Sequence, residues 1–292
     1  MNLLNVIDEI EKIDPEVYDR LDGRRAAMKK FMSFSGKVAM TAVPVALGTM
    51  LNKSYGQSVS QQILDVLNFA LTLEYLEAEF YVTGLAVSGL IPGGDDRNAF
   101  QTISTHEAQH VAFLRSTIIS LGGMPVAKPS FDYSAGNTAS AGNNSMTGPF
   151  ANVFTSYATY LAVSQTFEDT GVRAYKGQAG FLISSNEILR AALRIHSVEG
   201  RHASHVREIR RRNGLLVPAG VLLQPWITLN QSGIASAVVQ PSYNGEELTT
   251  QAGVNIVGIN GFDITSEDAS EAFDEPLTKA QVLAIVDPFI VP

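Results

Sequence analysis

The chain has 292 residues, of which 45% are hydrophobic and 17% charged, and this balance excludes a wholly disordered protein. The formal net charge of -8 disfavours nucleic acid as a partner, because an acidic surface repels the phosphate backbone. The chain has no cysteine, which excludes disulfides, iron–sulfur clusters and thiol chemistry but does not fix the redox state of its compartment.

The first segment, residues 1–56, has the layout of an export signal. Residues 4–34 show an amphipathic helical pattern, and an apolar run from Val38 to Leu51 follows the basic residues. The run is too short for a transmembrane helix, and the pair Arg24-Arg25 resembles a loose twin-arginine signal. We expect export to the periplasm or cell envelope. The alternative is a cytoplasmic protein that retains this segment as a helix packed on the following domain.

The central segment, residues 57–214, contains four long helical patterns, and their connections are short, long and short. A single long crossover between the second and third helices is typical of a ferritin-like up-down four-helix bundle. We therefore predict an all-α core built from helices near residues 58–89, 96–121, 149–177 and 184–213.

The last segment, residues 215–292, changes character. Its glycines, asparagines and β-branched pairs predict an irregular tail with short strands, and residues 276–286 predict a short helix with Pro276 at its start. The tail is too apolar to be left in solvent. We expect it to wrap the bundle or to contact another subunit, so that a homo-oligomer could form through the bundle or the tail.

Each of the four predicted helices has an apolar seam, and one glutamate interrupts each seam. The seam positions alternate by three and four residues, which places these side chains inside the bundle. Burying a carboxylate without a partner costs several kcal/mol, roughly, so four of them would oppose folding. Two divalent cations would neutralise the four inward carboxylates, Glu74, Glu107, Glu168 and Glu199.

Two histidines follow two of these glutamates at a spacing of three residues. Glu107-x-x-His110 and Glu199-x-x-His202 each place a carboxylate and an imidazole on one helical face. A single Glu from each of two helices and Glu-x-x-His from each of the other two form the ligand set of di-iron and di-manganese bundles. The spacing thus predicts a site for two metal ions, and oxygen and nitrogen ligands suit iron or manganese.

The two halves of the bundle resemble one another. Glu74 is followed seven residues later by Tyr81, and Glu168 is followed seven residues later by Tyr175. Both tyrosines are candidate catalytic residues, either as hydrogen-bond donors to the ligands or as redox-active groups. The alternative is that they are core tyrosines with satisfied hydroxyls.

The internal repeat also bears on Glu77, which lies one turn after Glu74 and could replace it as a ligand. The position that corresponds to Glu77 in the second half is Gly171, so we prefer Glu74. Glu77 remains a candidate for an additional ligand or for a neighbour that hydrogen-bonds the ligands.

The remaining histidines and the basic end of the fourth helix have simpler interpretations. We expect His106, His196 and His205 at the surface or in packing, although His196 could hydrogen-bond a metal ligand. The run Arg210-Arg211-Arg212 is expected to cap the fourth helix and to be solvated, because cations are favoured at a helix C-terminus.

Three sequence motifs identify a family resemblance. Residues 67–81 are very similar to the first helix of a bacterial and fungal ferritin-like domain family, some members of which are stress- or desiccation-related. Residues 105–110 and 197–203 resemble its second and fourth helix motifs. The resemblance covers about residues 58–213, and it implies that Glu107 and Glu199 bridge two metals while Glu74 and Glu168 are outer ligands.

Three functions are compatible with these features. The first is an oxidoreductase that reacts with O2 or peroxide, either ferroxidase-like or manganese-catalase-like, in the stress response. The second is a non-catalytic metal-binding stress protein, in which the metal mainly stabilises the bundle. The third is an envelope structural protein whose tail contacts a partner.

Overall fold

The computed structural model describes residues 61–136, 147–214, 218 and 221–291. The predicted N-terminal helix and its signal-like run lie outside these residues. Four long helices dominate the described part of the chain, and these are α4 (Gln61–Ala86), α5 (Asp95–Ser120), α6 (Tyr157–Ala179) and α7 (Asn186–Asn213). The predicted ferritin-like bundle is confirmed.

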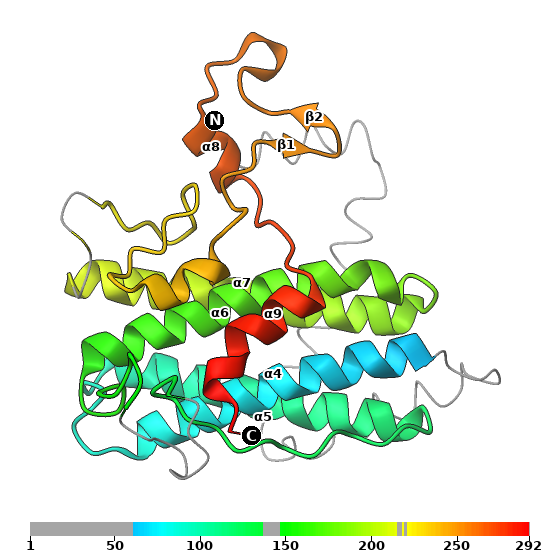
Figure 1. Ribbon diagram of the computed structural model, residues 1–292, viewed down its shortest axis with the longest axis vertical. Coiled ribbons are helices and arrows are strands. Elements are labelled where there is room, and N and C mark those ends of the chain that lie inside the picture. The colour runs from blue at the N-terminus through cyan, green and yellow to red at the C-terminus, as the bar shows by residue number, and fades with distance from the viewer. Residues whose placement is uncertain (1–60, 137–146, 215–217, 219–220, 292) are drawn as a thin grey trace, which may run out of the picture. The chain divides into compact units, whose positions relative to one another are not determined.

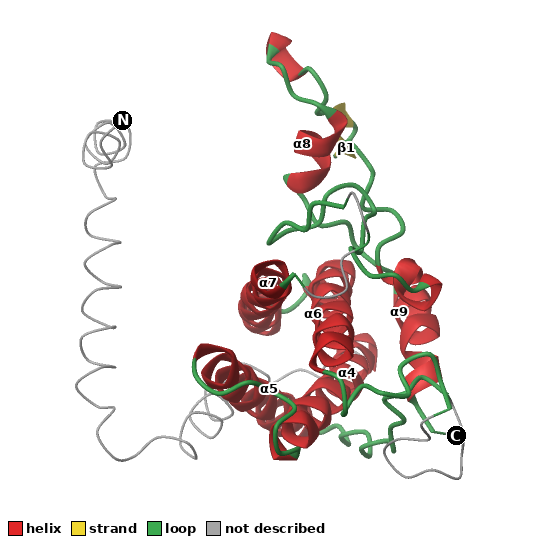
Figure 2. Cartoon of the chain, turned by 90° about the vertical axis from the view of Figure 1, so that its left-hand side faces the viewer, coloured by secondary structure: helices red, strands yellow, loops and turns green. Residues whose placement is uncertain are grey.

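The long helices pack in pairs. Helix α4 packs chiefly against α5, and α6 packs chiefly against α7. Figure 2 looks nearly along the helices and shows the two pairs around a common core, with a tail helix beside α4 and α6. Within the described residues, no helix combines the length and the apolar character needed to cross a membrane.

Local sequence sets the ends of the helices. The hydroxyl oxygens of Ser156 and Ser185 accept hydrogen bonds from backbone N–H groups in the first turns of α6 and α7. Helix α7 ends at Gly214, whose left-handed φ of 61° suits a glycine. The predicted start of the third helix at residue 149 is wrong by eight residues. Residues 148–155 form turns instead, tied to the crossover by the hydrogen bond from Phe150 N to Ser134 O.

The long crossover between α5 and α6 lies along the bundle and is held to α4. Tyr133 donates its hydroxyl to the carbonyl of Leu76 at 2.9 Å, and the amide of Val126 donates to the side chain of Asn68 at 2.7 Å. The end of the chain pairs with the crossover in turn, through an antiparallel bridge between Phe131 and Ile290.

The tail combines short helices with one small sheet. Strands β1 (Thr250–Gln251) and β2 (Val254–Asn255) are antiparallel, as the sequence predicted for short strands. The remaining elements are the α-helices α8 (Ser266–Glu271) and α9 (Lys279–Val286), and the 3-10 helices η1 (Gly180–Leu182), η2 (Ala237–Ser242), η3 (Ile259–Gly261) and η4 (Asp287–Phe289).

Helix α9 lies against α6, as Figure 1 shows in red. The predicted tail helix is therefore present, but it does not start at Pro276. Thr278 is its N-cap and forms a capping box with Gln281, so the helix begins at Lys279.

Three buried arginines hold the tail on α6 and α7. Arg173 forms an ion pair with Glu246 at 2.6 Å and donates to tail carbonyls, including that of Ser242 at 2.6 Å. Arg207 forms a pair with Asp169 at 2.5 Å, and the hydroxyl of Tyr243 donates to the same carboxylate at 2.8 Å. These contacts tie residues 226–275 to the two helices that follow the crossover.

The third arginine corrects a prediction. Arg210 is fully buried and donates to the side chain of Gln165 and to the carbonyl of Gly233, whereas the sequence predicted a solvated cap. Arg211 alone fits that prediction fully, since it is exposed and pairs with Glu208. Arg212 is also exposed but pairs with the buried carboxylate of Asp96, so it links α7 to α5.

Replacing Arg207 with Met is expected to destabilise the protein by about 3–5 kcal/mol, because it leaves Asp169 buried without its cation. Urea unfolding followed by circular dichroism measures this change. The control is Arg211→Met, which removes an exposed ion pair and should cost under about 1 kcal/mol. An equally small decrease in the free energy of unfolding in both variants would contradict the role of Arg207 in holding the tail.

Candidate metal centre

Six of the predicted residues meet at one level in the middle of the bundle. Helices α4 and α6 each contribute one glutamate, while α5 and α7 each contribute a glutamate and the histidine that lies one turn later. The glutamate side chains are fully buried and the histidines nearly so. The residues brought together are Glu74, Glu107, His110, Glu168, Glu199 and His202.

One half of this cluster surrounds the imidazole of His110. Its Nδ1 atom lies 3.1 Å from an oxygen of Glu74, 3.1 Å from Glu107 Oε2 and 3.0 Å from Glu199 Oε1. These four ligand atoms lie within 4.8 Å of one another, a spacing that allows one metal ion to contact them all.

The other half surrounds the imidazole of His202 in the same way. Its Nδ1 atom lies 2.9 Å from Glu107 Oε1, 3.3 Å from Glu168 Oε2 and 3.3 Å from Glu199 Oε2. The four ligand atoms of this group also lie within 4.8 Å of one another, a spacing that allows one metal ion to contact them all. Glu107 and Glu199 belong to both halves and present a different oxygen to each, whereas Glu74 and Glu168 belong to only one.

The cluster contains more acceptor atoms than its own donors satisfy. Among the described residues, oxygens of Glu107, Glu168 and Glu199 and the Nδ1 atom of His202 are buried with no hydrogen bond of suitable geometry. Buried polar atoms are seldom left without partners in proteins unless an ion or a water molecule completes their bonding. A set of oxygen and imidazole nitrogen donors fits iron or manganese. The six residues could therefore hold metal ions.

The cluster contains four carboxyl groups and only two imidazoles. Burial lowers the pKa of His202, but the carboxylate of Glu168 and the contacts with Glu107 and Glu199 outweigh burial and raise it to about 12. Burial also lowers the pKa of His110, but the carboxylates of Glu74, Glu107 and Glu199 outweigh burial and raise it. Burial and the charge of Glu199 raise the pKa of Glu107 well above its usual range, and burial raises the pKa of Glu168 to about 7. Without a metal ion the cluster is therefore neutralised in part by protons, which a bound cation would displace.

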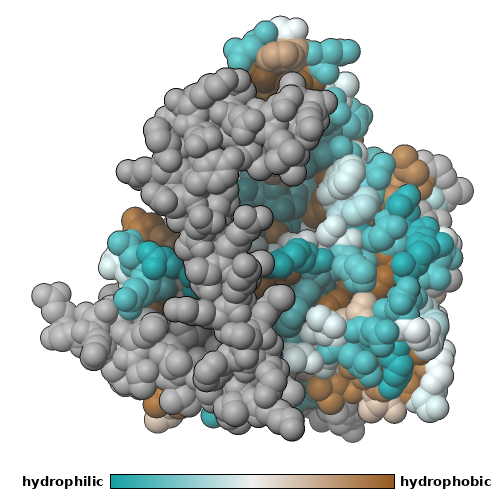
Figure 3. All heavy atoms as spheres, turned by 180° about the vertical axis from the view of Figure 1, so that it is seen from behind, coloured by the Kyte–Doolittle hydropathy of each residue, from teal (hydrophilic) through white to brown (hydrophobic). Residues whose placement is uncertain are grey.

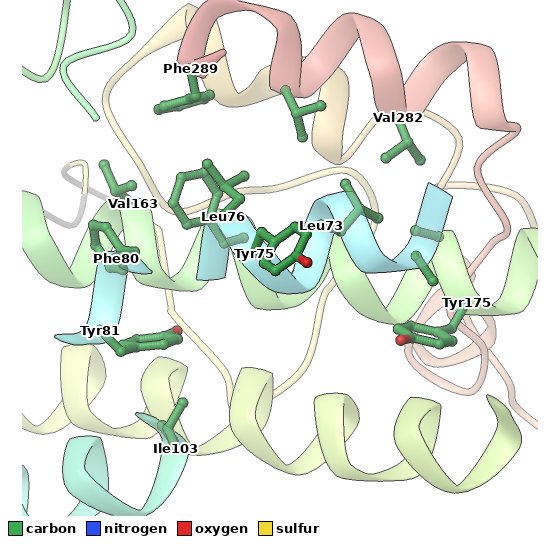
Figure 4. Close-up of a cluster of buried hydrophobic side chains, with 14 of the residues drawn as sticks. Leu73, Tyr75, Leu76, Phe80, Tyr81, Ile103, Val163, Tyr175, Val282 and Phe289 are labelled. Carbon is green, nitrogen blue, oxygen red and sulfur yellow. The ribbon is translucent and has the colours of Figure 1, made fainter. Parts of the chain in front are cut away.

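Both predicted tyrosines hydrogen-bond the outer glutamates. Tyr81 of α4 donates to Glu168 of α6, and Tyr175 of α6 donates to Glu74 of α4. Figure 4 shows the two hydroxyls directed toward one another from opposite ends of the core. Burial and the neighbouring carboxylates raise the pKa of each phenol, so both remain protonated donors. Ser164 lies 2.9 Å from the Tyr81 hydroxyl and has no equivalent contact at Tyr175 among the described residues.

Glu77 also points toward the cluster, and Gly171 makes room for it. A Cβ atom at position 171 would lie 3.3 Å from Glu77 Oε1 and 3.8 Å from the Cγ atom of Glu199. Burial, followed by the charges of the four ligand carboxylates, raises the pKa of Glu77 well above its usual range. Glu77 is thus a neutral neighbour of the cluster in the protein alone.

The sequence did not identify the role of His106, which was expected at the surface or in packing. Its Nδ1 atom lies 2.9 Å from Nε2 of His202, and the two rings are stacked. Burial lowers the pKa of His106, as do the charges of His202 and His110, so Nδ1 of its neutral ring can accept a hydrogen bond from Nε2–H of His202. This contact turns Nδ1 of His202 toward the carboxylates.

The position of His106 could have been found from its spacing, because it lies one turn before His110 on the side of α5 that faces α7. The corresponding residue of the second half is Val198, so the two halves differ here. The other histidines do not join the cluster. His196 places Nδ1 3.0 Å from the carbonyl oxygen of Val172, and His205 is exposed.

The fold and the cluster together define a helix-bundle protein with a buried carboxylate–histidine centre. A family model described as "Ferritin-like domain" matches residues 62–212, just over half of the chain. The chain belongs to the ferritin-like domain family. No curated protein matches it closely enough to be compared.

Replacing His106 with Ala is expected to weaken metal binding by about 10- to 100-fold, because His202 loses the acceptor that orients its ring. Titration with Mn²⁺ against a competing chelator measures this affinity. The exposed His205→Ala variant is the matched control and should bind as the unmodified protein does. Equal affinities in all three proteins would show that His106 is only a packing residue.

Proposed function

We propose that this protein binds two iron or manganese ions and uses them as an oxidoreductase with O2 or peroxide in stress protection. The observation that carries the proposal is the sharing of Glu107 and Glu199 between two ligand groups that are otherwise separate. Shared carboxylates of this kind favour two adjacent ions over one.

Each residue of the cluster then has a defined part in holding the ions. Glu107 and Glu199 would bind both ions, Glu74 and His110 would complete one, and Glu168 and His202 the other. Two such ions, when bound, supply an exchange of two electrons with an oxidant at a single site. The protein's contribution is to fix the ligands and to exclude bulk water.

The tyrosines Tyr81 and Tyr175 act on the outer ligands. Each donates its hydroxyl to one outer glutamate, which fixes the orientation of that carboxylate. Because each bond joins α4 to α6, the two hydroxyls also hold the helix pairs in register. A Phe in either position would keep the packing and remove only the bond.

The double variant Glu107→Ala, Glu199→Ala is expected to lose bound metal, because it removes both shared ligands. Elemental mass spectrometry on protein expressed with iron and manganese should give about two ions per unmodified chain and almost none in the variant. Glu79→Ala is the control, since Glu79 pairs with Lys128 outside the cluster. Equal metal content in all three proteins would place the ions elsewhere.

A second function, a metal site that only stabilises the bundle, is supported by the fact that all four long helices supply ligands. Removing metal with a chelator should lower the melting temperature under either function, because bound ions stabilise the folded state. Turnover separates the two. We expect the metal-loaded protein to oxidise Fe(II) with O2 or to consume peroxide, and Tyr81→Phe, Tyr175→Phe to slow this with metal content unchanged. A fully loaded protein without turnover would favour the stabilising role.

A further inference from the structure

A small apolar cavity lies inside the bundle, between α4, α5, α6 and α7. Its volume is about 20 Å³, and all but two of the residues that line it have pure hydrocarbon side chains. The exceptions are Tyr175 and Gln178. A cavity of this size holds one molecule about as large as water.

Water is poorly suited to this cavity, because a buried water needs two to four hydrogen-bond partners, roughly. The hydroxyl of Tyr175 already donates to Glu74. The amide nitrogen of Gln178 is buried and has no hydrogen-bond partner among the described residues, so it is the single free donor that the lining offers. Apolar cavities stay dry and bind small apolar molecules instead.

The inner wall of the cavity adjoins the metal cluster. Ala70, Leu114 and Ile195 line the cavity, and each lies one helical turn from a ligand on its own helix. Tyr175 lines the cavity with its ring while its hydroxyl contacts the ligand Glu74. Figure 4 shows Tyr175 at this end of the core, across from Tyr81.

The outer wall adjoins the surface. An open groove between α4, the end of α6 and the start of α9 shares Val66 and Gln178 with the cavity, and Phe181 and Lys279 also border it. Val66 and Gln178 therefore lie between the groove and the cavity.

The opposite approach to the cluster carries imidazole and charged side chains. A second open groove, between α5 and α7, is bordered by His202 itself and by His106, Arg201 and Glu208. On the face turned away from the viewer of Figure 1, the described surface is mostly hydrophilic with small hydrophobic areas (Figure 3). The cluster therefore has one approach lined almost entirely by hydrocarbon side chains and one that also carries imidazole and charged groups.

We propose that the apolar cavity admits dioxygen, and not peroxide, to the cluster, so that O2 is an oxidant of the proposed function on which this inference rests. Dioxygen is small and apolar, and it loses few hydrogen bonds when it leaves water. Peroxide needs several partners, and the cavity offers only Gln178. Polar reactants and metal ions use the groove beside His106 and His202.

Two alanines allow a matched test. Ala192 lines the cavity, whereas its neighbour Ala191 lines neither the cavity nor the groove beside His106, and both are half-buried residues of α7. We expect xenon, in pressurised crystals of the full chain, to occupy the cavity of the unmodified protein and of Ala191→Leu. Xenon should be absent from Ala192→Leu, and from Ala70→Val as a smaller second substitution.

Dioxygen consumption by the iron-loaded proteins gives the second readout. It should fall several-fold in Ala192→Leu and stay unchanged in Ala191→Leu. No xenon in the unmodified cavity, or an unchanged rate in Ala192→Leu, would overturn the cavity's role and leave the proposed function standing. A xenon-filled cavity in a fully loaded protein that consumes no dioxygen would instead overturn the proposed function, and the role of the cavity with it.

Discussion

The structure depends on a cluster of buried carboxyl groups that outnumbers the imidazoles beside it and is neutralised in part by protons. Four glutamates, with Glu77 beside them, lie at one level of the bundle and face only two imidazoles. Buried charge of one sign opposes folding unless further positive charge is supplied. The oxygens around His110 and around His202 form two adjacent groups, and each group could hold one cation. Each group is complete only while the helices that contribute to it keep their positions along one another.

The rest of the fold fixes that register. Tyr81 and Tyr175 each join α4 to α6 through an outer glutamate, so the contacts cross between the two helix pairs. On the outer side of α6, Asp169 follows the candidate ligand Glu168 directly and is held by Arg207 and by Tyr243 of the tail. The tail thus holds the helix that carries Glu168, and the arginine contacts fix the tail to α6 and α7.

Sequence reasoning predicted those features of the structure that depend on the spacing of residues along a single helix. The seam spacing places Glu74 and Glu168 inside, and the Glu-x-x-His spacing brings His110 and His202 beside them. The errors come from contacts that no local pattern contains. The burial of Arg210 depends on the carbonyl of Gly233 in the irregular tail, and the delayed start of α6 depends on a turn bonded to Ser134. His106 was missed because its partner, His202, is supplied by a distant helix.

The most direct test of the central claim is anomalous diffraction from crystals of the metal-loaded protein, measured at the iron and manganese absorption edges. Two adjacent peaks are expected. One should lie among Glu74, Glu107, His110 and Glu199, and the other among Glu107, Glu168, Glu199 and His202. The absence of a peak from both groups in crystals grown with excess metal would contradict the claim, since the carboxylates would then be neutralised by protons alone.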